Sequence, residues 1–457
     1  MKNLIDEEKY YKRNIDAELA NWCRNITNKT IALVSGARRI GKTHSLKFLG
    51  QTQFKRYEII DVQQLAKNVV NRLKKKGTNI KYFIEYLLLN FGIDESDINE
   101  GLLIIFDEIQ EHGELREAVS LFNSIFKCRF ACTGSALWID DTNGTRPTAD
   151  YEKFFVYPFS FKQFLNIVDE GNDLFLEEKE KFNKKSDGNA NQKLMRLLRL
   201  YMVVGGMPQP IQHFLDHKDD DDVFATLQQR KKTAIITTYQ NDLIRYSDVF
   251  KLRLTDSYLS IIRDTGKFRT SGGMIHAYKK LEQMNLIIVT KNLTSVNRKL
   301  LLSTDESIIK PFLLDVGVLF YYFCEDANPL VIQSCCKTFV DGKDADDNGY
   351  IYENFVASTL IQHGYIPYFK TFEAANDKGE IKTHEIDFLF TGIDETIALE
   401  SKSGKDKEHK SLIRGLKKYN KIKSSYILCK SYKFDRNNLH RGPHYIPFYA
   451  LEFLLEK

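Results

Sequence analysis

The chain has 457 residues, which is enough for about three domains that each bury a core of their own. Charged residues make up 28% and apolar residues 43% of it, as in ordinary globular proteins. The formal net charge of +5 is too small to indicate a polyanionic partner. A nucleic-acid hypothesis must therefore rest on local clusters of basic residues.

The cysteine pattern and the apolar segments bear on the compartment. The seven cysteines form no C-x-x-C pair and no metal-ligand spacing, so we expect reduced and mostly buried thiols. Residues 1–8 are charged almost from the start, and no signal peptide is visible there. The longest apolar stretch, residues 311–323, contains Asp315 and is too short to span a bilayer. These features predict a cytoplasmic protein that does not contact a membrane.

The first predicted elements are a helix, a buried strand over residues 31–34 and a loop of the form G-x-x-x-x-G-K-[ST]. The helix lies within residues 7–25 and carries an apolar stripe of Tyr11, Ile15, Leu19 and Trp22. A second helix, which begins at His44, follows the loop. The loop consists of Gly36, Ala37, Arg38, Arg39, Ile40, Gly41, Lys42 and Thr43.

This strand–loop–helix order is the context that a phosphate-binding loop requires. Two glycines let the backbone curl so that successive N–H groups face one anion, and the helix start adds the positive end of its dipole. Lys42 is expected to reach the β- and γ-phosphates, and the Thr43 hydroxyl to ligate Mg²⁺. The flanking elements disfavour a plain glycine turn with a solvated lysine. The loop and His44 therefore predict a site for ATP and Mg²⁺.

The next informative segment is an apolar run, residues 102–106, that ends in Asp107 and Glu108, as a buried parallel strand does. We expect Asp107 to hold Mg²⁺ through water and Glu108 to act as general base on the attacking water. An ordinary strand end is the alternative, and the P-loop upstream favours the catalytic interpretation. Between the loop and this run, the pattern predicts a strand and two helices over residues 57–62, 63–75 and 80–91.

A predicted helix over residues 113–126 leads to a short strand, 129–135, that ends in small polar residues. Thr133 or Ser135 is placed to reach the γ-phosphate, although a simple turn at a strand end fits equally well. Residues 154–157 are the candidate last strand. No Asn-Lys-x-Asp pattern for reading guanine occurs, so ATP is favoured over GTP.

These motifs resemble a group of bacterial and archaeal AAA-type ATPases that continue into a winged helix and a restriction-endonuclease-like domain of unknown function. The resemblance extends over nearly the whole chain and implies a five-stranded parallel core with Thr133 at the sensor position. In that group an arginine often follows the sensor strand, which makes Arg146 a candidate arginine finger, although it is shifted by one residue. The motifs are residues 36–43, 106–110, 133–135, 157–161 and 205–208.

The middle of the chain carries weaker signals. Residues 168–192 are charged and sparsely apolar, which predicts an exposed insertion. A helix over 194–200 is expected to stop at Gly205 and Gly206. The run Asp219–Asp222 lacks the spaced ligands of a calcium loop, so we interpret it as a solvated turn.

Residues 250–323 predict a winged helix, with helices over 256–264 and 273–285 and strands over 286–289 and 299–302. Two interpretations stay open. The module docks on DNA through its basic side chains, or it is a spacer packed on the ATPase. The basic candidates are Lys279, Lys280, Lys291, Arg298 and Lys299.

A second constellation lies near the C-terminus. Strand period two places Glu385 and Asp387 on one face of a strand, and Glu400 and Lys402 on one face of the next. If these strands pair as a hairpin, Asp387 and Glu400 would hold Mg²⁺ and Lys402 would orient or activate water for phosphodiester hydrolysis. Two half-exposed strands with charges facing water are the alternative.

This Asp…Glu-x-Lys set resembles the PD-(D/E)XK nuclease superfamily, in which a helical glutamate often joins the metal site. Glu353, on a predicted amphipathic helix, matches that glutamate. Residues 402–423 add nine lysines or arginines against two carboxylates. Such a cluster suits a phosphate backbone, although a solvated helix face would look similar.

Together the patterns predict an α/β protein that hydrolyses ATP and couples this to a nuclease-like, DNA-associated domain. The alternative is an ATP-dependent binding or signalling switch whose last domain only grips nucleic acid or a protein. Self-association into a homo-oligomer stays open. The predicted domains are an AAA-type P-loop ATPase, a helical connector, a winged helix and a restriction-endonuclease-like α/β domain, over residues 1–165, 166–249, 250–340 and 341–457.

Overall fold

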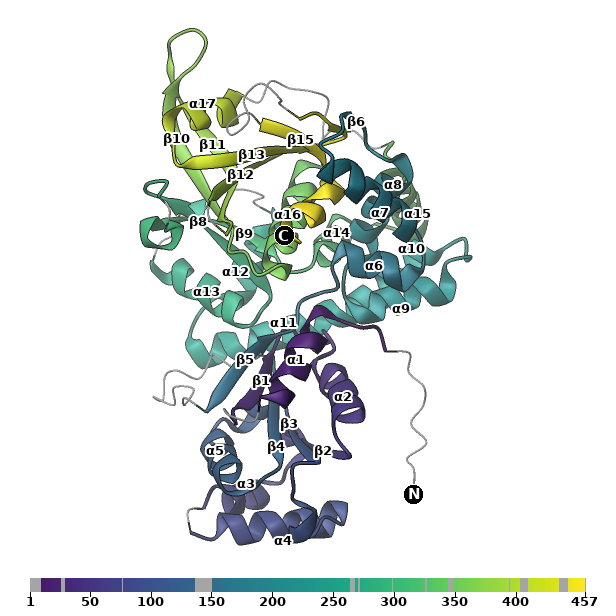
Figure 1. Cartoon of the computed structure of the whole chain (residues 1–457), viewed down its shortest axis with the longest axis vertical. Coiled ribbons are helices and arrows are strands. Elements are labelled where there is room, and N and C mark those ends of the chain that lie inside the picture. Colours follow the sequence, from purple (N-terminus) through teal and green to yellow (C-terminus); the bar gives the residue numbers. More distant parts are fainter. Residues whose placement is uncertain are drawn as a thin grey trace. The chain divides into compact units, whose positions relative to one another are not determined.

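The computed structural model divides into two compact units, Met1–Tyr157 with Gln283–Asn285, and Pro158–Glu282 with Leu286–Lys457 (Figure 1). The structure describes residues 10–25, 29–75, 77–135, 150–263, 268–269, 272–297, 299–324, 327–343, 348–393, 395–402, 410–434 and 443–456.

A five-stranded parallel sheet with strand order β2-β3-β4-β1-β5 forms the centre of the first unit. Its inner strands are buried apolar runs, which is typical of a parallel sheet covered on both faces. The five-stranded parallel core that the resemblance implied is confirmed. The strands are β1 (Ile31–Ser35), β2 (Arg56–Asp61), β3 (Leu102–Asp107), β4 (Arg129–Gly134) and β5 (Tyr151–Phe155).

The edge strand β5 differs from the predicted range 154–157. It begins three residues earlier, at Tyr151, and of its five residues only Phe154 is fully buried. Exposed Glu152 and Lys153 interrupt the apolar pattern, so the sequence signal begins too late.

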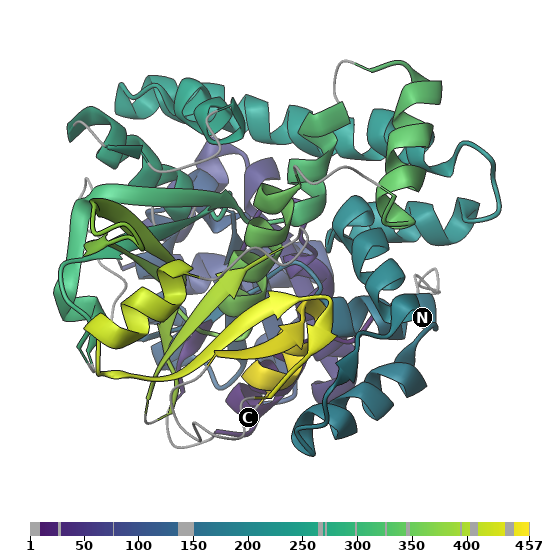
Figure 2. The same cartoon turned by 90° about the horizontal axis from the view of Figure 1, so that it is seen from above.

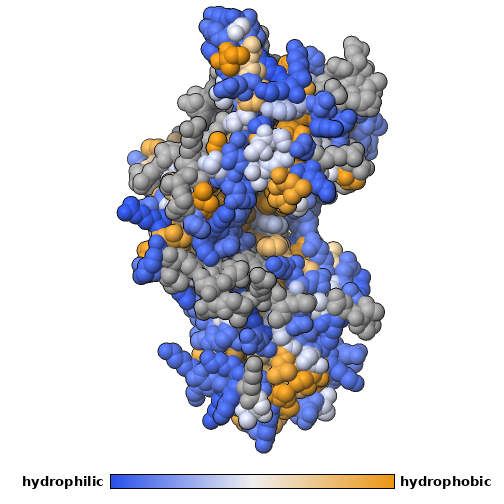
Figure 3. All heavy atoms as spheres, turned by 90° about the vertical axis from the view of Figure 1, so that its left-hand side faces the viewer, coloured by the Kyte–Doolittle hydropathy of each residue, from blue (hydrophilic) through white to orange (hydrophobic). Residues whose placement is uncertain are grey.

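Among the described residues, five α-helices belong to the first unit, and the sequence predicts an apolar stripe for the first of them. In the first helix Ile15, Leu19 and Trp22 are buried, as predicted, whereas Tyr11, the other residue of the predicted stripe, lies before the helix and is half-buried. Figure 3 shows apolar residues gathered in its lower part, where this unit lies. The helices are α1 (Asn14–Arg24), α2 (Lys42–Gln53), α3 (Lys67–Lys74), α4 (Asn79–Phe91) and α5 (Leu115–Ile125).

Helices make up most of the second unit. They are α6 (Phe161–Val168), α7 (Asn172–Asn183), α8 (Gln192–Val204), α9 (Pro208–His217), α10 (Val223–Thr226), α11 (Thr233–Phe250), α12 (Leu254–Arg263), α13 (Gly272–Gln283), α14 (Val316–Cys324), α15 (Pro329–Val340), α16 (Gly349–Gln362), α17 (Lys410–Lys418) and α18 (Leu451–Leu455). Helix α8 ends before Gly205, as predicted, and the acidic run Asp219–Asp222 is exposed.

Helix α7 corrects the prediction of an exposed insertion over residues 168–192. Its side chains Phe175, Glu178 and Phe182 are buried, and its charged residues lie mainly on the opposite, exposed face. The segment is therefore an amphipathic helix that belongs to the packed core of this unit.

A mixed eight-stranded sheet forms the other part of the second unit, with strand order β15-β13-β12-β11-β10-β8-β9-β7. A two-stranded sheet joins β6 (Gly188–Asn189) to β14 (Ser431–Tyr432). The strands of the large sheet are β7 (Phe268–Arg269), β8 (Ile287–Leu293), β9 (Thr304–Leu313), β10 (Tyr368–Ala375), β11 (Ile381–Thr391), β12 (Thr396–Ser401), β13 (Ile422–Cys429) and β15 (Pro443–Pro447).

The predicted strand over residues 299–302 is wrong. Residues Leu300–Ser303 form a 3-10 helix, and the strand that pairs with β8 begins only at Thr304. Leu301 and Leu302 are exposed, so their apolar character does not mark a buried strand.

Two helices, α17 and α16, pack on this sheet near β11. Helix α17 packs on the face that carries Ile386, where Gly415 permits close approach because a Cβ there would lie 2.7 Å from Ile386 Cδ1. Figure 2 shows α17 (yellow-green) against the strands. Glu385 and Asp387 alternate with Ile386 and therefore face the other way. Helix α16, which contacts β9 and β12, is buried almost all round rather than amphipathic.

All seven cysteines are free thiols, and five of them are buried, in line with the prediction. Among the helices of the described residues, none has the length and apolarity needed to cross a membrane.

Candidate functional site

The P-loop connects β1 to α2 in an unusual backbone conformation. Gly41 (φ 99°) and Arg39 (φ 64°) adopt left-handed conformations. At Gly36 a Cβ atom would lie 2.6 Å from the carbonyl oxygen of Val156, so only glycine fits there. Within the loop the side chains of Ala37 and Ile40 are buried, whereas Arg39 and the following His44 are exposed. These positions keep the loop curled.

The ammonium group of Lys42 lies over this curled loop. Its Nζ donates to the carbonyl oxygens of Gly36 and Ala37, each at 3.1 Å, and the residue is only 4% exposed. A buried ammonium held at the first turns of the loop suits the role of a phosphate ligand.

Arg13 braces the same loop, and the sequence analysis missed it. Its guanidinium donates to the carbonyl oxygen of Ile40 at 2.7 Å and to that of Tyr157 at 3.0 Å. Burial lowers the pKa of Arg13 to about 10. No local pattern could have revealed the contact with Tyr157, because 144 residues separate the two.

Asp107 joins three predicted site residues. Its carboxylate accepts from the Thr43 hydroxyl at 2.9 and 3.1 Å and from the Thr133 hydroxyl. The Thr133 oxygen in turn accepts from the backbone N–H of Glu108 at 3.2 Å. A hydroxyl and a carboxylate brought together at the helix start are hard oxygen donors, the kind that Mg²⁺ prefers. The donor set therefore fits this ion.

Glu108 lies just beyond β3 in a left-handed conformation (φ 56°). Its carboxylate accepts a hydrogen bond from the Gln110 side-chain amide, a partner that the sequence analysis did not assign. Ser135 is buried at the end of β4. Arg146, the candidate arginine finger, lies outside the described residues.

The second site, called here the C-terminal site, consists of Glu353, Glu385, Asp387, Glu400, Lys402 and Lys310. Strands β11 and β12 pair antiparallel, as the hairpin hypothesis requires, with Phe388 opposite Leu399. The Asp387 carboxylate accepts from the backbone N–H of Ser401 at 2.9 Å. The Lys402 ammonium lies 2.9 Å from Glu400 Oε1.

Burial and like charges raise the pKa values of acids in this site. Burial, with Asp387 adding to it, raises the pKa of Glu400 to about 8, although Lys402 acts in the opposite direction. Burial also raises the pKa of Glu353 against the opposing effect of Lys310. Although burial opposes it, the charges of Glu400 and Asp387 raise the pKa of Lys402.

The donors of this site suit a divalent cation. Glu400 is 3% exposed, and its Oε2 atom is buried without a hydrogen-bond partner among the described residues. Such an oxygen, with the Asp387 carboxylate in the neighbouring strand, offers a hard ligand for Mg²⁺. Among the described residues, no group of three or more His, Cys, Asp or Glu side chains is placed to hold a metal ion, so the side chains of this site would have to move to bind one together.

Lys310 is the member of the C-terminal site that the sequence analysis missed. It lies on β9, pairs with the Glu353 carboxylate and lies 3.5 Å from Glu385 Oε1. Only 7% of its side chain is exposed. Lys310 falls within the predicted winged helix, so no local signal connects it to the later motif.

Several basic residues proposed for DNA contact are already paired. In α17, Lys410 and Arg414 both pair with Asp377, and Lys418 donates to the Glu373 carbonyl oxygen at 2.9 Å. Lys417 is exposed. Lys405 and Lys407 lie outside the described residues.

In the predicted winged helix, Lys279 and Lys291 lie 2.9 and 2.8 Å from the Glu306 carboxylate. These two hydrogen bonds lower the pKa of Glu306 to about 2. Arg298 lies outside the described residues. Glu306 therefore neutralises part of the positive charge expected there.

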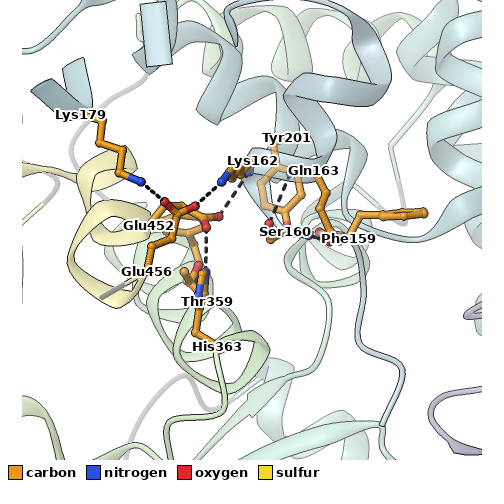
Figure 4. Close-up of polar contacts among 11 residues, drawn as sticks. Phe159, Ser160, Lys162, Gln163, Lys179, Tyr201, Thr359, His363, Glu452 and Glu456 are labelled. Atoms are coloured by element: carbon orange, nitrogen blue, oxygen red, sulfur yellow. Dashed lines mark hydrogen bonds and ion pairs between the residues drawn. The ribbon is translucent and has the colours of Figure 1, made fainter. Parts of the chain in front are cut away.

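A third polar cluster ties α18 to α6, α7 and α16 (Figure 4). Buried Glu452 accepts from the backbone N–H of Lys162 at 3.3 Å and lies 2.7 Å from His363 Nε2. Glu456 pairs with Lys162 and Lys179 at 2.6 and 2.5 Å. The cluster fastens the start of α6 to the last helix, and we assign it no chemistry.

The fold and the P-loop geometry define a nucleotide-binding domain of the P-loop class. Residues 28–165 match the sequence profile of an AAA domain, and residues 348–451 match that of a domain of unknown function (DUF4143). No curated protein matches the sequence. The chain therefore contains an AAA-type ATPase domain followed, nearer its C-terminus, by a domain of unknown function.

Among solved structures, the chain matches the Walker-type ATPase PABY2304 of Pyrococcus abyssi. It is 14% identical, with 69% of this chain and 96% of that chain covered, at a TM-score of 0.44. Cdc6p of Pyrobaculum aerophilum is 11% identical, with coverages of 74% and 99% and a TM-score of 0.30.

Proposed function

We propose that this protein binds and hydrolyses ATP and that its C-terminal site hydrolyses phosphodiester bonds of DNA under the control of the bound nucleotide. The observation that carries the first half is the meeting of the Thr43 hydroxyl with the Asp107 carboxylate beside buried Lys42. These are the groups that an MgATP complex needs in a P-loop domain.

The roles follow from position. Lys42 binds the β- and γ-phosphates, while Thr43 and Asp107 hold Mg²⁺ directly or through water. Glu108 orients and deprotonates the attacking water. Thr133, hydrogen-bonded to the Asp107 carboxylate and to the backbone N–H of Glu108, reports on the γ-phosphate.

Phosphate release from MgATP tests this half. Lys42→Ala and Glu108→Gln should each lower the rate by about a hundredfold or more, since a phosphate ligand or the general base is lost. Exposed Lys67→Ala, in the same unit, should leave it unchanged. Equal release from wild type and Lys42→Ala would refute the hydrolase proposal.

The second half rests on the convergence of Asp387, Glu400, Lys402 and Glu353. Asp387 and Glu400, joined by Glu353, would hold Mg²⁺, and Lys402 would orient or activate the attacking water. In this proposal residues 250–340 are a winged helix, and residues 341–457 have a restriction-endonuclease-like fold.

DNA cleavage with Mg²⁺ tests the second half. Asp387→Asn and Glu400→Gln should abolish cleavage, whereas Glu380→Gln, at the exposed turn between β10 and β11, should not. Cleavage that persists unchanged in Asp387→Asn would refute the nuclease proposal, because a metal ligand would have been removed without effect.

A binding switch is the second candidate, and a specific observation favours it. Both lysines of the C-terminal site are paired with carboxylates, so neither is free to activate water, whereas Lys417 and Lys418 of α17 are exposed. A domain of this kind would grip DNA without cleaving it. Salt-dependent binding without cleavage, lost in the double variant Lys417→Glu, Lys418→Glu, would support the switch.

A further inference from the structure

Lys310 belongs to the C-terminal site in space but not in sequence. Its strand, β9, ends 35 residues before the segment that matches DUF4143 begins at residue 348. Nevertheless its ammonium pairs with Glu353 and lies 3.5 Å from Glu385 Oε1. A residue of the preceding segment thus supplies one of the two ammonium groups of this site.

The position of Lys310 is fixed along its whole length. Its backbone pairs with Thr290 of β8, and the Thr290 hydroxyl donates to its carbonyl oxygen at 2.6 Å. The Nζ atom lies 5.6 Å from the centroid of the Phe312 ring. The side chain is therefore held beside Phe312 and Glu353, and only 7% of it is exposed.

The charges of the site divide between its two lysines. Four carboxylates, Glu353, Glu385, Asp387 and Glu400, are set against the ammonium groups of Lys310 and Lys402. Lys402 pairs with Glu400, and Lys310 pairs with Glu353 and lies near Glu385, so carboxylates outnumber ammonium groups in the site. Buried carboxylates need a cation close by, because like charges in a poorly solvated place repel strongly. Lys310 occupies the place of that cation between Glu353 and Glu385.

We propose that Lys310 is an internal counter-ion of the C-terminal site. It holds Glu353 and Glu385 in place without metal, and a divalent cation that binds Glu353 must displace its ammonium. Lys310 is in this sense a positioning residue. The inference rests on the proposed role of Glu353 as a metal ligand, but it is tested by metal affinity rather than by cleavage.

The test is Mn²⁺ binding to the full chain without nucleotide, with free Mn²⁺ measured by electron paramagnetic resonance. Lys310→Met keeps most of the length of the side chain and removes the charge, so it should bind Mn²⁺ roughly tenfold more tightly than wild type. Lys310→Arg keeps the charge and should behave as wild type. Lys291→Met is the matched control, because this lysine of β8 pairs with Glu306 outside the site.

The double variant Lys310→Met, Asp387→Asn tests whether the tighter binding occurs at the C-terminal site. Because Asp387→Asn removes a proposed metal ligand of that site, the gain in Mn²⁺ affinity should be lost. A merely structural lysine would lower stability without tightening Mn²⁺ binding. Unchanged or weaker binding in folded Lys310→Met would overturn the proposal.

A measurement on the wild-type chain covers the case in which Lys310→Met does not fold. Saturating Mn²⁺ should increase the labelling of Lys310 by acetic anhydride, read by mass spectrometry, because displacement frees the amine from its carboxylates. Unchanged labelling of Lys310 would overturn the proposal that it is a counter-ion displaced by metal.

The nuclease and counter-ion proposals fail separately. Tighter Mn²⁺ binding by Lys310→Met without any DNA cleavage supports the counter-ion and refutes the nuclease. Cleavage by wild type with equal Mn²⁺ affinity in both proteins refutes the counter-ion alone. Absence of Mn²⁺ binding in both proteins overturns both.

Discussion

Gly36 is a position in the P-loop where a single added carbon would collide with backbone. Its Cβ would lie 2.6 Å from the Val156 carbonyl oxygen, which is backbone and cannot move aside cheaply. Gly36→Ala should weaken MgATP binding at least about tenfold, because the loop must shift away from the phosphates. Isothermal titration calorimetry measures this. Gly188→Ala, where nothing lies within 4 Å of the added carbon, is the control, and equal affinities would contradict the expectation.

Gln110 holds the proposed general base in position. Its side-chain amide donates to the Glu108 carboxylate. Gln110→Ala should therefore lower kcat for ATP hydrolysis, by roughly two- to fivefold, because a less well oriented base activates water less well, and it should leave ATP affinity unchanged. Phosphate release at saturating ATP measures this, and an unchanged kcat would show that the hydrogen bond does not orient Glu108.

At the residue scale, the sequence predicts best those site residues that belong to a short motif with fixed spacing. The P-loop residues and the Asp107–Glu108 pair could be named because their spacing specifies a backbone shape next to a strand. Arg13 and Lys310 could not be named, because each acts through contacts with residues far away along the chain. Which of the lysines of α17 are already neutralised by Asp377 is likewise invisible before folding.

At the scale of the elements, the stability of the contact between α18 and α16 should depend on pH, because Glu452 of α18 pairs with His363. Burial alone would lower the pKa of His363, but the Glu452 carboxylate outweighs burial and raises it, with Glu456 adding to this and Lys162 opposing it. A histidine whose folded pKa is raised stabilises the fold fully below its unfolded pKa, about 6.5, and loses that contribution as pH rises through the folded pKa.

His363→Gln, which stays neutral, isolates this charge. The loss of unfolding free energy in the variant should be larger at pH 5.5 than at pH 8.5, by about 1 kcal/mol. Urea unfolding at both pH values measures it, with His276→Gln, a histidine of α13 outside this cluster, as control. An equal loss at both pH values would show that the histidine is neutral throughout.

The elements that the sequence mispredicted share a cause. The buried face of α7 packs on distant aromatic rings, with Phe175 4.7 Å from Phe453 and Phe182 6.2 Å from Phe434 between centroids. Its charged residues dominate the local composition and conceal three buried positions. Conversely, Leu301 and Leu302 look like strand residues but are 62% and 78% exposed. Local composition predicts burial correctly only where the folded chain also provides apolar partners for the side chains concerned.

For the whole molecule, MgATP should stabilise the first unit. Ligand at a hundred times its Kd adds about 2.7 kcal/mol to the free energy of unfolding of the part that binds it. Because the chain forms two compact units, we expect calorimetric scanning to show the shift in one transition only. Lys42→Ala should show no shift, and an equal shift in that variant would contradict a P-loop origin.

The eight-stranded sheet limits where the chain can be truncated to give a soluble C-terminal fragment. Strand β10 pairs with β8 through Tyr368 opposite Lys291, and Lys370 Nζ donates to the Leu293 carbonyl oxygen at 2.6 Å. A fragment that starts at residue 341 leaves β10 as a bare edge with unsatisfied amides, a template for aggregation. A fragment that starts at residue 286 keeps β8 and β9 in place. Solubility of the two fragments, compared side by side, should therefore favour the longer one.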